Sequence, residues 1–199
     1  MAEYFDLGKA PESPEERQEL LGKREFMDSL IEKQALTQVQ AVVVDFLLTT
    51  KGYLPADLRI NHTAELTLAD GKTFQTPADI LVVIDDKPAL FVKCSMSSLV
   101  SWDRHAVAFC RVGAGKPIPF ALVTDGADIR LISGLDGSVS EGRLEDIPSR
   151  EEMIRVLASM TVSCYPEEKC DKERRILYAF DAIRCPILAE GYPKKPDGQ

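Results

Sequence analysis

The chain has 199 residues, 45% of them hydrophobic and 28% charged, which is the ordinary mixture of a globular protein with one substantial domain and an extension. Such a chain can build a core without disulfides or metals. Its net charge of −8 and isoelectric point of about 4.9 argue against tight nonspecific binding to a polyanion, although a local basic face stays compatible with them.

No apolar run approaches the ~20 residues that a membrane helix needs. The first six residues contain neither a basic region nor an apolar stretch, so no signal peptide is evident. We therefore expect a cytoplasmic protein without a membrane partner. An odd number of cysteines in such a chain argues against a disulfide framework. The five cysteines are Cys94, Cys110, Cys164, Cys170 and Cys185.

Two helices are predicted before the first strand. Apolar residues recur at helical spacing among charges from Pro14 to Ile31. Thr37 and Gln40 form a capping-box pattern that predicts the start of a second helix. Gly52 suits the position just beyond the end of that helix.

Strand-like segments follow in the centre of the chain. Alternation of apolar and polar residues predicts a strand over residues 58–68, and Asp70-Gly71 predicts a hairpin turn after it. Further strands are predicted at residues 80–84, 89–94, 120–123 and 129–132, with a helix over residues 98–112. Residues 134–148 are predicted to be a polar loop, and two helices are predicted at residues 149–160 and 171–183.

This order of elements predicts an α/β fold with a mixed β-sheet flanked by helices. We divide the chain into an N-terminal helical extension (1–35), a core (36–135) and a C-terminal helical extension (136–199).

One pair of segments carries the functional argument. Pro77-Ala78-Asp79 enters one strand, and Phe91-Val92-Lys93 lies on the strand predicted to pair with it. This spacing resembles the PD-(D/E)xK nuclease motif. The resemblance implies that an aspartate and a Glu-x-Lys sequence converge on a divalent metal, which activates a water and neutralises the phosphate. Asp79 would then bind Mg²⁺, and Lys93 would position or deprotonate the water.

Phe91 departs from this motif. Side chains alternate along a strand, so Phe91 and Lys93 share one face. The motif requires Glu or Asp at position 91, and a phenyl ring cannot ligate a hard cation. Asp79 would be the one carboxylate that the motif supplies.

Further segments extend the resemblance to about residues 36–133. They look like the N-terminal domain of the type I restriction enzyme R subunit, a restriction-endonuclease-like fold. The matching stretches are Pro77 to Val83, Lys87 to Lys93, Arg104 to Phe109 and Pro119 to Gly126.

Two other motif positions are also altered. Relatives usually carry Q-x-x-x-Y on the helix after the lysine strand, where this chain has His105 and Phe109. They also place an acidic residue and an arginine on the first core helix, and residues 36–40 offer neither. We therefore expect a degenerate catalytic site, with Asp79, Lys93 and His105 as its remnants. The expected role is a DNA-associated or protein-interaction module, with DNA, a protein or a second copy of the chain as partner.

Two alternatives stay open. An active Mg²⁺-dependent DNA nuclease would need a relocated carboxylate, for which Glu65, Asp103 and Asp125 are candidates. A metal or iron–sulfur accessory protein would instead use Cys164, Cys170 and Cys185, although their spacing lacks a compact C-x-x-C pattern.

Structural explanations compete with these functional ones. Asp79 could bond nearby backbone amides, and a lysine in a buried strand needs a partner, so an Asp79–Lys93 ion pair would survive the loss of catalysis. His105 could line a site or simply be a polar flank of its helix. Arg104, Arg111 and Lys116 could form a modest basic edge or a solvated surface.

Overall fold

The computed structural model describes residues 13–160 and 165–182. Residues 35–184 belong to one compact unit, which carries the whole sheet, and the residues before 35 belong to another. Within the described ranges, no helix is long and apolar enough to cross a membrane.

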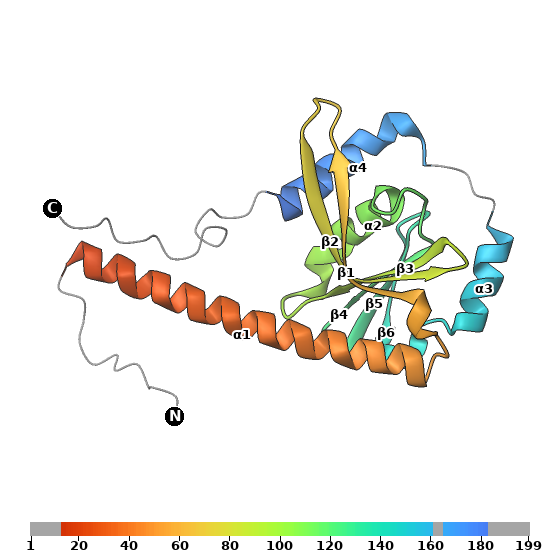
Figure 1. The fold of residues 1–199 in the computed structure, drawn as a ribbon, viewed down its shortest axis with the longest axis horizontal. Helices are drawn as coiled ribbons and strands as arrows, with labels where there is room; N and C mark the ends of the chain where they lie inside the picture. Colours follow the sequence, from red (N-terminus) through yellow and green to blue (C-terminus); the bar gives the residue numbers. More distant parts are fainter. Residues whose placement is uncertain (1–12, 161–164, 183–199) are drawn as a thin grey trace. The chain divides into compact units, whose positions relative to one another are not determined.

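A six-stranded mixed sheet forms the centre of the larger unit (Figure 1). Its strands lie side by side in chain order, and every neighbouring pair is antiparallel except β3 and β4, which are parallel. A parallel pair needs a crossover connection, and helix α2 supplies it. The strands are β1 (Leu58–Thr67), β2 (Thr73–Ile84), β3 (Lys87–Cys94), β4 (Phe120–Thr124), β5 (Asp128–Ser133) and β6 (Val139–Arg143).

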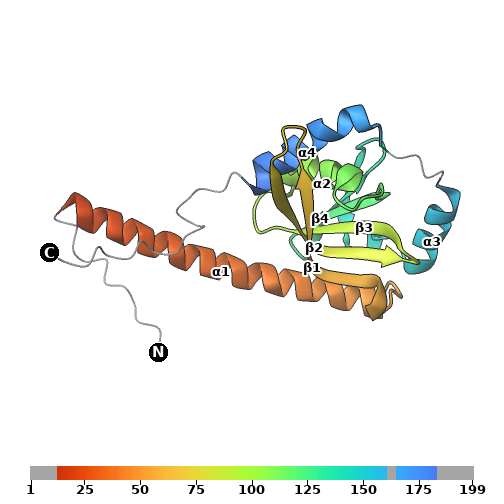
Figure 2. The ribbon, with the colours of Figure 1, turned by 45° about the horizontal axis from the view of Figure 1, so that its top comes forward.

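Helix α1 (Pro14–Thr49) covers one face of this sheet with its C-terminal part, while α2 (Asp103–Val112) and α4 (Glu167–Asp181) cover the other face (Figure 2). This arrangement confirms the predicted α/β fold with a mixed sheet flanked by helices, and it is consistent with a restriction-endonuclease-like fold. The expected C-terminal extension supplies β6, α3 (Arg150–Ser159) and α4, which lie in the same compact unit as the sheet.

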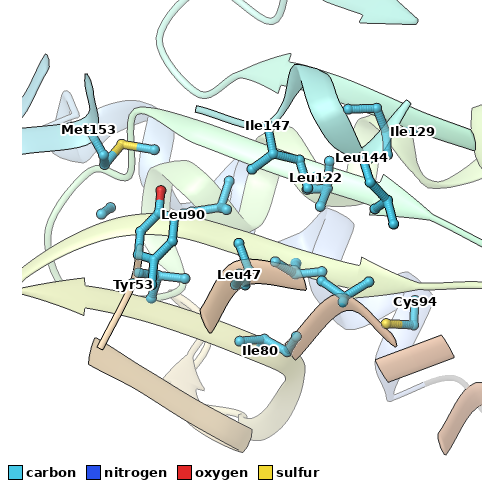
Figure 3. Packing of buried hydrophobic residues seen from close by; sticks show 14 of the residues in the cluster. Leu47, Tyr53, Ile80, Leu90, Cys94, Leu122, Ile129, Leu144, Ile147 and Met153 are labelled. Atoms are coloured by element: carbon cyan, nitrogen blue, oxygen red, sulfur yellow. The ribbon is translucent and has the colours of Figure 1, made fainter. Parts of the chain in front are cut away.

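The face under α1 is filled by aliphatic side chains, which Figure 3 shows in close-up. Leu47 of α1 packs there with Ile80 of β2 and Leu90 of β3, and Met153 of α3 closes the same cluster. The face under α2 and α4 has its own cluster, which includes Leu81, Phe91, Phe109, Ile132 and Leu177. The sheet therefore has a buried apolar core on both sides.

The prediction of two N-terminal helices was wrong, because Pro14–Thr49 is a single helix. Thr37 lies inside it, and the residues around Thr37 include neither proline nor glycine to stop the preceding turn. Gly52 does end the helix as expected: its φ is +74°, and the next residue, Tyr53, donates its N–H to the Leu47 carbonyl at 3.1 Å.

The predicted loop over residues 134–148 was also wrong in part, because it contains β6 and the short 3-10 turn Leu144–Asp146. The β6 sequence, Val-Ser-Glu-Gly-Arg, has one apolar residue and lies at the exposed edge of the sheet. An edge strand that buries little gives no alternating pattern to detect. The predicted helix over residues 98–112 begins as a 3-10 turn, η2 (Leu99–Trp102), before α2.

Candidate functional site

Asp79 and Lys93 come together between β2 and β3. The register sets Ile80 opposite Val92, so the residues next to them, Asp79 and Lys93, are cross-strand neighbours. The Lys93 Nζ lies 3.3 Å from the Asp79 Oδ2, and the two side chains are 13% and 25% exposed. They therefore form a largely buried ion pair.

Asp79 is held by more than Lys93. The backbone N–H of Cys94 donates to the same Oδ2 at 2.7 Å, and the Nε2 of Gln40 donates to the Asp79 backbone carbonyl at 2.6 Å. Gln40 also donates to the Oδ1 of Asn61 at 2.9 Å. The first core helix thus reaches this site through an amide rather than through an acid or an arginine.

The chain bends at this point. Ala78 packs on the α2 side of the sheet, whereas Ile80 packs on the α1 side, so the alternation of side chains changes phase between them. On the neighbouring strand, Asn61 has a φ of +53°. The hairpin of β1 and β2 turns away from the rest of the sheet here (Figure 1). Asp79 therefore occupies the junction between the flat sheet and the bent hairpin.

The Lys93 ammonium has a second neighbour, the indole of Trp102. Its Nζ lies 4.9 Å from that ring centroid, and a cation over an indole gains about 0.5–2 kcal/mol depending on desolvation. Trp102 is itself oriented by a long hydrogen bond from its Nε1 to the Ser97 Oγ, at 3.4 Å. A carboxylate and an aromatic ring thus satisfy the lysine without a ligand.

Phe91 takes the place of the expected acid and belongs to the core. It is fully buried, and its ring stacks on Phe109 with centroids 4.1 Å apart and planes 16° from parallel. It lies on the α2 side of β3, while Leu90 and Val92 lie on the α1 side, as the strand alternation predicts. The two altered motif positions, Phe91 and Phe109, therefore contact each other.

His105 is enclosed by a different set of residues. Its Nε2 lies 2.9 Å from the Asp181 Oδ2, which also accepts a hydrogen bond from the Thr76 hydroxyl at 2.6 Å. The His105 side chain is fully buried, and the rings of Trp102 and Phe180 meet it at 5.3 and 5.4 Å. Among the described residues, its Nδ1 has no hydrogen-bond partner.

The three predicted site residues thus form two separate groups. Asp79 and Lys93 touch each other, and Trp102 contacts both Lys93 and His105. Sequence reasoning missed Asp181, the partner of His105, because α4 lies 76 residues further along the chain. The catalytic role of Asp79, Lys93 and His105 stays a prediction.

Two of the three candidate relocated carboxylates, Asp103 and Asp125, are engaged in other contacts. Both oxygens of Asp103 accept hydrogen bonds from Arg130, at 2.8 and 2.6 Å. Asp125 accepts hydrogen bonds from backbone N–H groups of its own turn at 2.9 Å. Glu65 lies on β1 opposite Gln75, which precedes Asp79 by four residues on β2. In the part of the chain that the structure describes, no three His, Cys, Asp or Glu residues are grouped to hold a metal ion.

The donors around Asp79 do not fit a magnesium site. Mg²⁺ prefers an octahedral shell of oxygen ligands, and Asp79 offers one carboxylate whose Oδ2 already meets Lys93 and the Cys94 N–H. Burial and the neighbouring charge of Asp79 raise the pKa of the Cys94 thiol to about 12, against the opposing effect of Lys93. That thiol is protonated at neutral pH and is a poor ligand.

The cysteine alternative falls partly beyond the described chain, because Cys164 and Cys185 lie outside it. Cys170 is buried, and its Sγ lies 3.5 Å from the Pro166 carbonyl. Burial and then the charge of Glu167 raise the pKa of this thiol. Cys94 and Cys110 are likewise free and buried.

The expected basic edge is largely neutralised. Arg104 and Arg111 both donate to the buried carboxylate of Glu173, at 2.5 and 2.9 Å. Tyr165 donates its hydroxyl to the same carboxylate at 3.1 Å. These residues join α2 to α4 rather than presenting free cations.

Comparison with known proteins adds little. No protein-family model matches the chain, and no curated protein matches it. A solved fragment assigned to the HsdR subunit of a type I restriction enzyme from Vibrio vulnificus YJ016 is similar over 62% of this chain, with a TM-score of 0.46 and 19% identity. The match covers 25% of that chain. The likeness is distant, and what the structure itself shows is an α/β fold with a six-stranded mixed sheet flanked by helices.

Proposed function

We propose that this chain is a nuclease-fold protein that binds a protein partner and does not cleave DNA. The observation that carries the proposal is the state of the motif residues. Asp79 and Lys93 neutralise each other, and Phe91 is stacked in the core where the second acid of the motif is required. The pair then has a structural role at the bend of the β1–β2 hairpin.

A protein partner suits the surface beside this pair better than DNA does. The segment from the Lys93 strand to α2 carries two exposed apolar side chains, Met96 and Val100, which are 53% and 59% exposed. Large exposed apolar side chains such as these can take part in protein contacts when they form a patch. Arg104 and Arg111, which follow on α2, are already paired with Glu173, and this leaves them little charge for phosphates.

Cleavage assays test the first half of the proposal. Plasmid and single-stranded DNA would be incubated with the purified chain and Mg²⁺ or Mn²⁺, beside Asp79→Ala and Lys93→Ala variants. We expect equal, background cleavage in all three. Metal-dependent cleavage that both variants abolish would establish the rival hypothesis, an active nuclease.

Photo-crosslinking tests the second half. A photoreactive amino acid at Val100 would report a partner on the proposed surface, and the same group at Ile154, an exposed residue of α3, serves as the matched control. We expect one defined adduct from position 100 and none from position 154. Strong, salt-sensitive DNA affinity without any adduct would favour the second candidate role, a DNA-associated module.

A further inference from the structure

A hollow of about 300 Å³ lies on the α2 side of the sheet, away from the Asp79–Lys93 pair. Leu81 and Val83 of β2 form its apolar floor, and the residues after α2 form one wall. Its volume is at the lower end of the ~300–1,000 Å³ typical of small-molecule sites. It has room for a small ligand.

Three basic side chains from two distant segments line this hollow. Arg59 and His62 come from β1, and Lys116 comes from the loop after α2. Arg59 lies opposite Leu81 in the β1–β2 register, and cross-strand partners project to the same face of a sheet. The guanidinium therefore belongs to the face that carries the apolar floor.

Arg59 is unusual among the arginines of the compact unit. Within the residues that the structure describes, its side chain has no carboxylate and no hydrogen-bond partner, and Lys116 donates only to the Asp86 backbone carbonyl at a long 3.4 Å. Most other arginines of the unit do pair with carboxylates: Arg104, Arg111, Arg130, Arg150, Arg155, Arg174 and Arg175. Unpaired cations that converge in a chain of net charge −8 favour an anionic ligand.

One carboxylate completes the lining. Asp86 occupies the tight β2–β3 turn with a φ of +58°, and its side chain has no ion-pair partner in the described ranges. The Asp86 carboxylate would weaken the binding of an anion that has no hydrogen-bond donor to offer it. A ligand that also carries a hydroxyl or amino group would donate a hydrogen bond to Asp86 instead.

We propose that this hollow binds a small phosphate monoester that carries a hydroxyl or amino donor, such as a nucleoside monophosphate. Arginine and lysine converging from different segments suit a phosphate, whose three terminal oxygens can be shared between them. The non-phosphate part of the ligand would pack against the apolar floor. This inference is independent of the proposed loss of cleavage, since none of its residues belongs to the nuclease motif.

Nuclear magnetic resonance titration of the full chain tests the proposal. The probes are inorganic phosphate, adenosine monophosphate, adenosine, and a short single strand with or without a 5′-phosphate. We expect saturable shifts of the Leu81, Ala114 and Lys116 amides with the monophosphate, weaker ones with phosphate, and none with adenosine. Binding of the 5′-phosphorylated strand alone would support the same monoester site and identify a strand end as its source.

Matched variants decide whether the hollow is responsible. Arg59→Gln and Lys116→Gln should each weaken binding of the monophosphate about ten- to a hundredfold, the usual effect of removing a charge-assisted hydrogen bond. Arg143→Gln, an exposed arginine on the opposite edge strand, makes the same charge change and should leave the affinity intact. Equal weakening by Arg59→Gln and Arg143→Gln, or no saturable shift with any phosphate, would overturn the proposal.

Discussion

At the residue scale, the environment of Asp79 decides what the motif can do. Its Oδ2 meets an ammonium group and a backbone N–H, and its backbone carbonyl accepts from Gln40. Hydrogen bonds to a charged group in a part-buried position are each worth about 1.5–3 kcal/mol. Displacing Lys93 to make room for a metal would cost a comparable free energy, unless further carboxylate ligands stabilised the bound metal.

Substitution of this pair tests its structural role. Asp79→Ala should lower the free energy of unfolding by about 1–3 kcal/mol, because the Cys94 N–H and the Lys93 ammonium both lose their acceptor. Lys93→Met should cost less, since a thioether packs well against Trp102. Urea denaturation of both variants and the double variant would measure the coupling. An unchanged stability in Asp79→Ala would contradict a structural pair.

Phe91 allows a second test at this scale. Phe91→Glu restores the acid of the motif but buries a carboxylate against Phe109, so we expect loss of folding rather than gain of cleavage. Phe91→Leu, the apolar control, should stay folded with a smaller loss, below the ~3–5 kcal/mol typical of Phe→Ala. A folded Phe91→Glu variant that cleaves DNA with Mg²⁺ would show that only this side chain separates the fold from activity.

The Asp79–Lys93 pair could be predicted from the sequence, whereas the contacts of Gln40 and Asn61 could not. Period-two alternation was enough to put Phe91 and Lys93 on one face and to make an Asp79–Lys93 pair the expected outcome. Gln40 and Asn61 carried no signal, because a hydrogen bond between side chains of different elements depends on tertiary packing alone.

At the element scale, α4 is attached to α2 by polar contacts as well as by packing. Glu173 lies almost fully buried between Arg104, Arg111 and Tyr165, and Asp181 meets His105 near the other end of the helix. The two helices lie side by side over the same face of the sheet (Figure 2). Removing this charge should loosen α4 before it affects the sheet.

Glu173→Gln tests that expectation. We expect a loss of about 1.5–3 kcal/mol, the range for charge-assisted hydrogen bonds, since Arg104 is 43% exposed and regains water. Glu168→Gln, on the exposed side of the same helix, is the control and should be near neutral. Thermal or urea unfolding gives the comparison, and equal stabilities of the two variants would contradict a role for the Glu173 contacts.

The contacts of Glu173 also make the stability of the protein depend on pH in the acidic range. Burial tends to raise the pKa of Glu173, but hydrogen bonds from Arg104 and Arg111 outweigh it and hold the pKa below its usual 4.5. A depressed folded-state pKa gives stability that is present above pH 4.5 and is lost as the pH falls through the folded value.

Hydrogen exchange of the Leu177 amide in α4 should therefore accelerate as the pH falls below 4.5, relative to Met153 in α3, after correction for the intrinsic rate. The Glu173→Gln variant should lack this difference. An acid response of the same size in the variant would assign it to another group.

Elements with a strong pattern were predictable and weak ones were not. The apolar run of β2 and the stripe of α1 that ends at Leu47 gave clear signals, because each buries a full face. The capping pattern at Thr37 was misleading, since packing and the absence of a breaker let one helix continue through it. The edge strand β6 buries too little to leave an alternating pattern.

At the scale of the whole molecule, the charge of the protein disfavours binding to a nucleic acid. The chain carries a net charge of −8, and the arginines of its compact unit are mostly paired with carboxylates. Such a surface gains little from releasing counterions of a nucleic acid. The proposed loss of cleavage is compatible with an intact α/β fold, since a fold does not imply a function.

Mn²⁺ titration followed by nuclear magnetic resonance tests the central claim most directly, because a paramagnetic ion broadens the amides beside its site. The account predicts no saturable broadening centred on the amides of residues 79 and 94, and the same small Mn²⁺-induced broadening in wild type and Asp79→Asn at each Mn²⁺ concentration. Saturable broadening at these two amides that Asp79→Asn abolishes would show that Asp79 binds a divalent metal, and it would contradict the assignment of Asp79 and Lys93 as a purely structural pair.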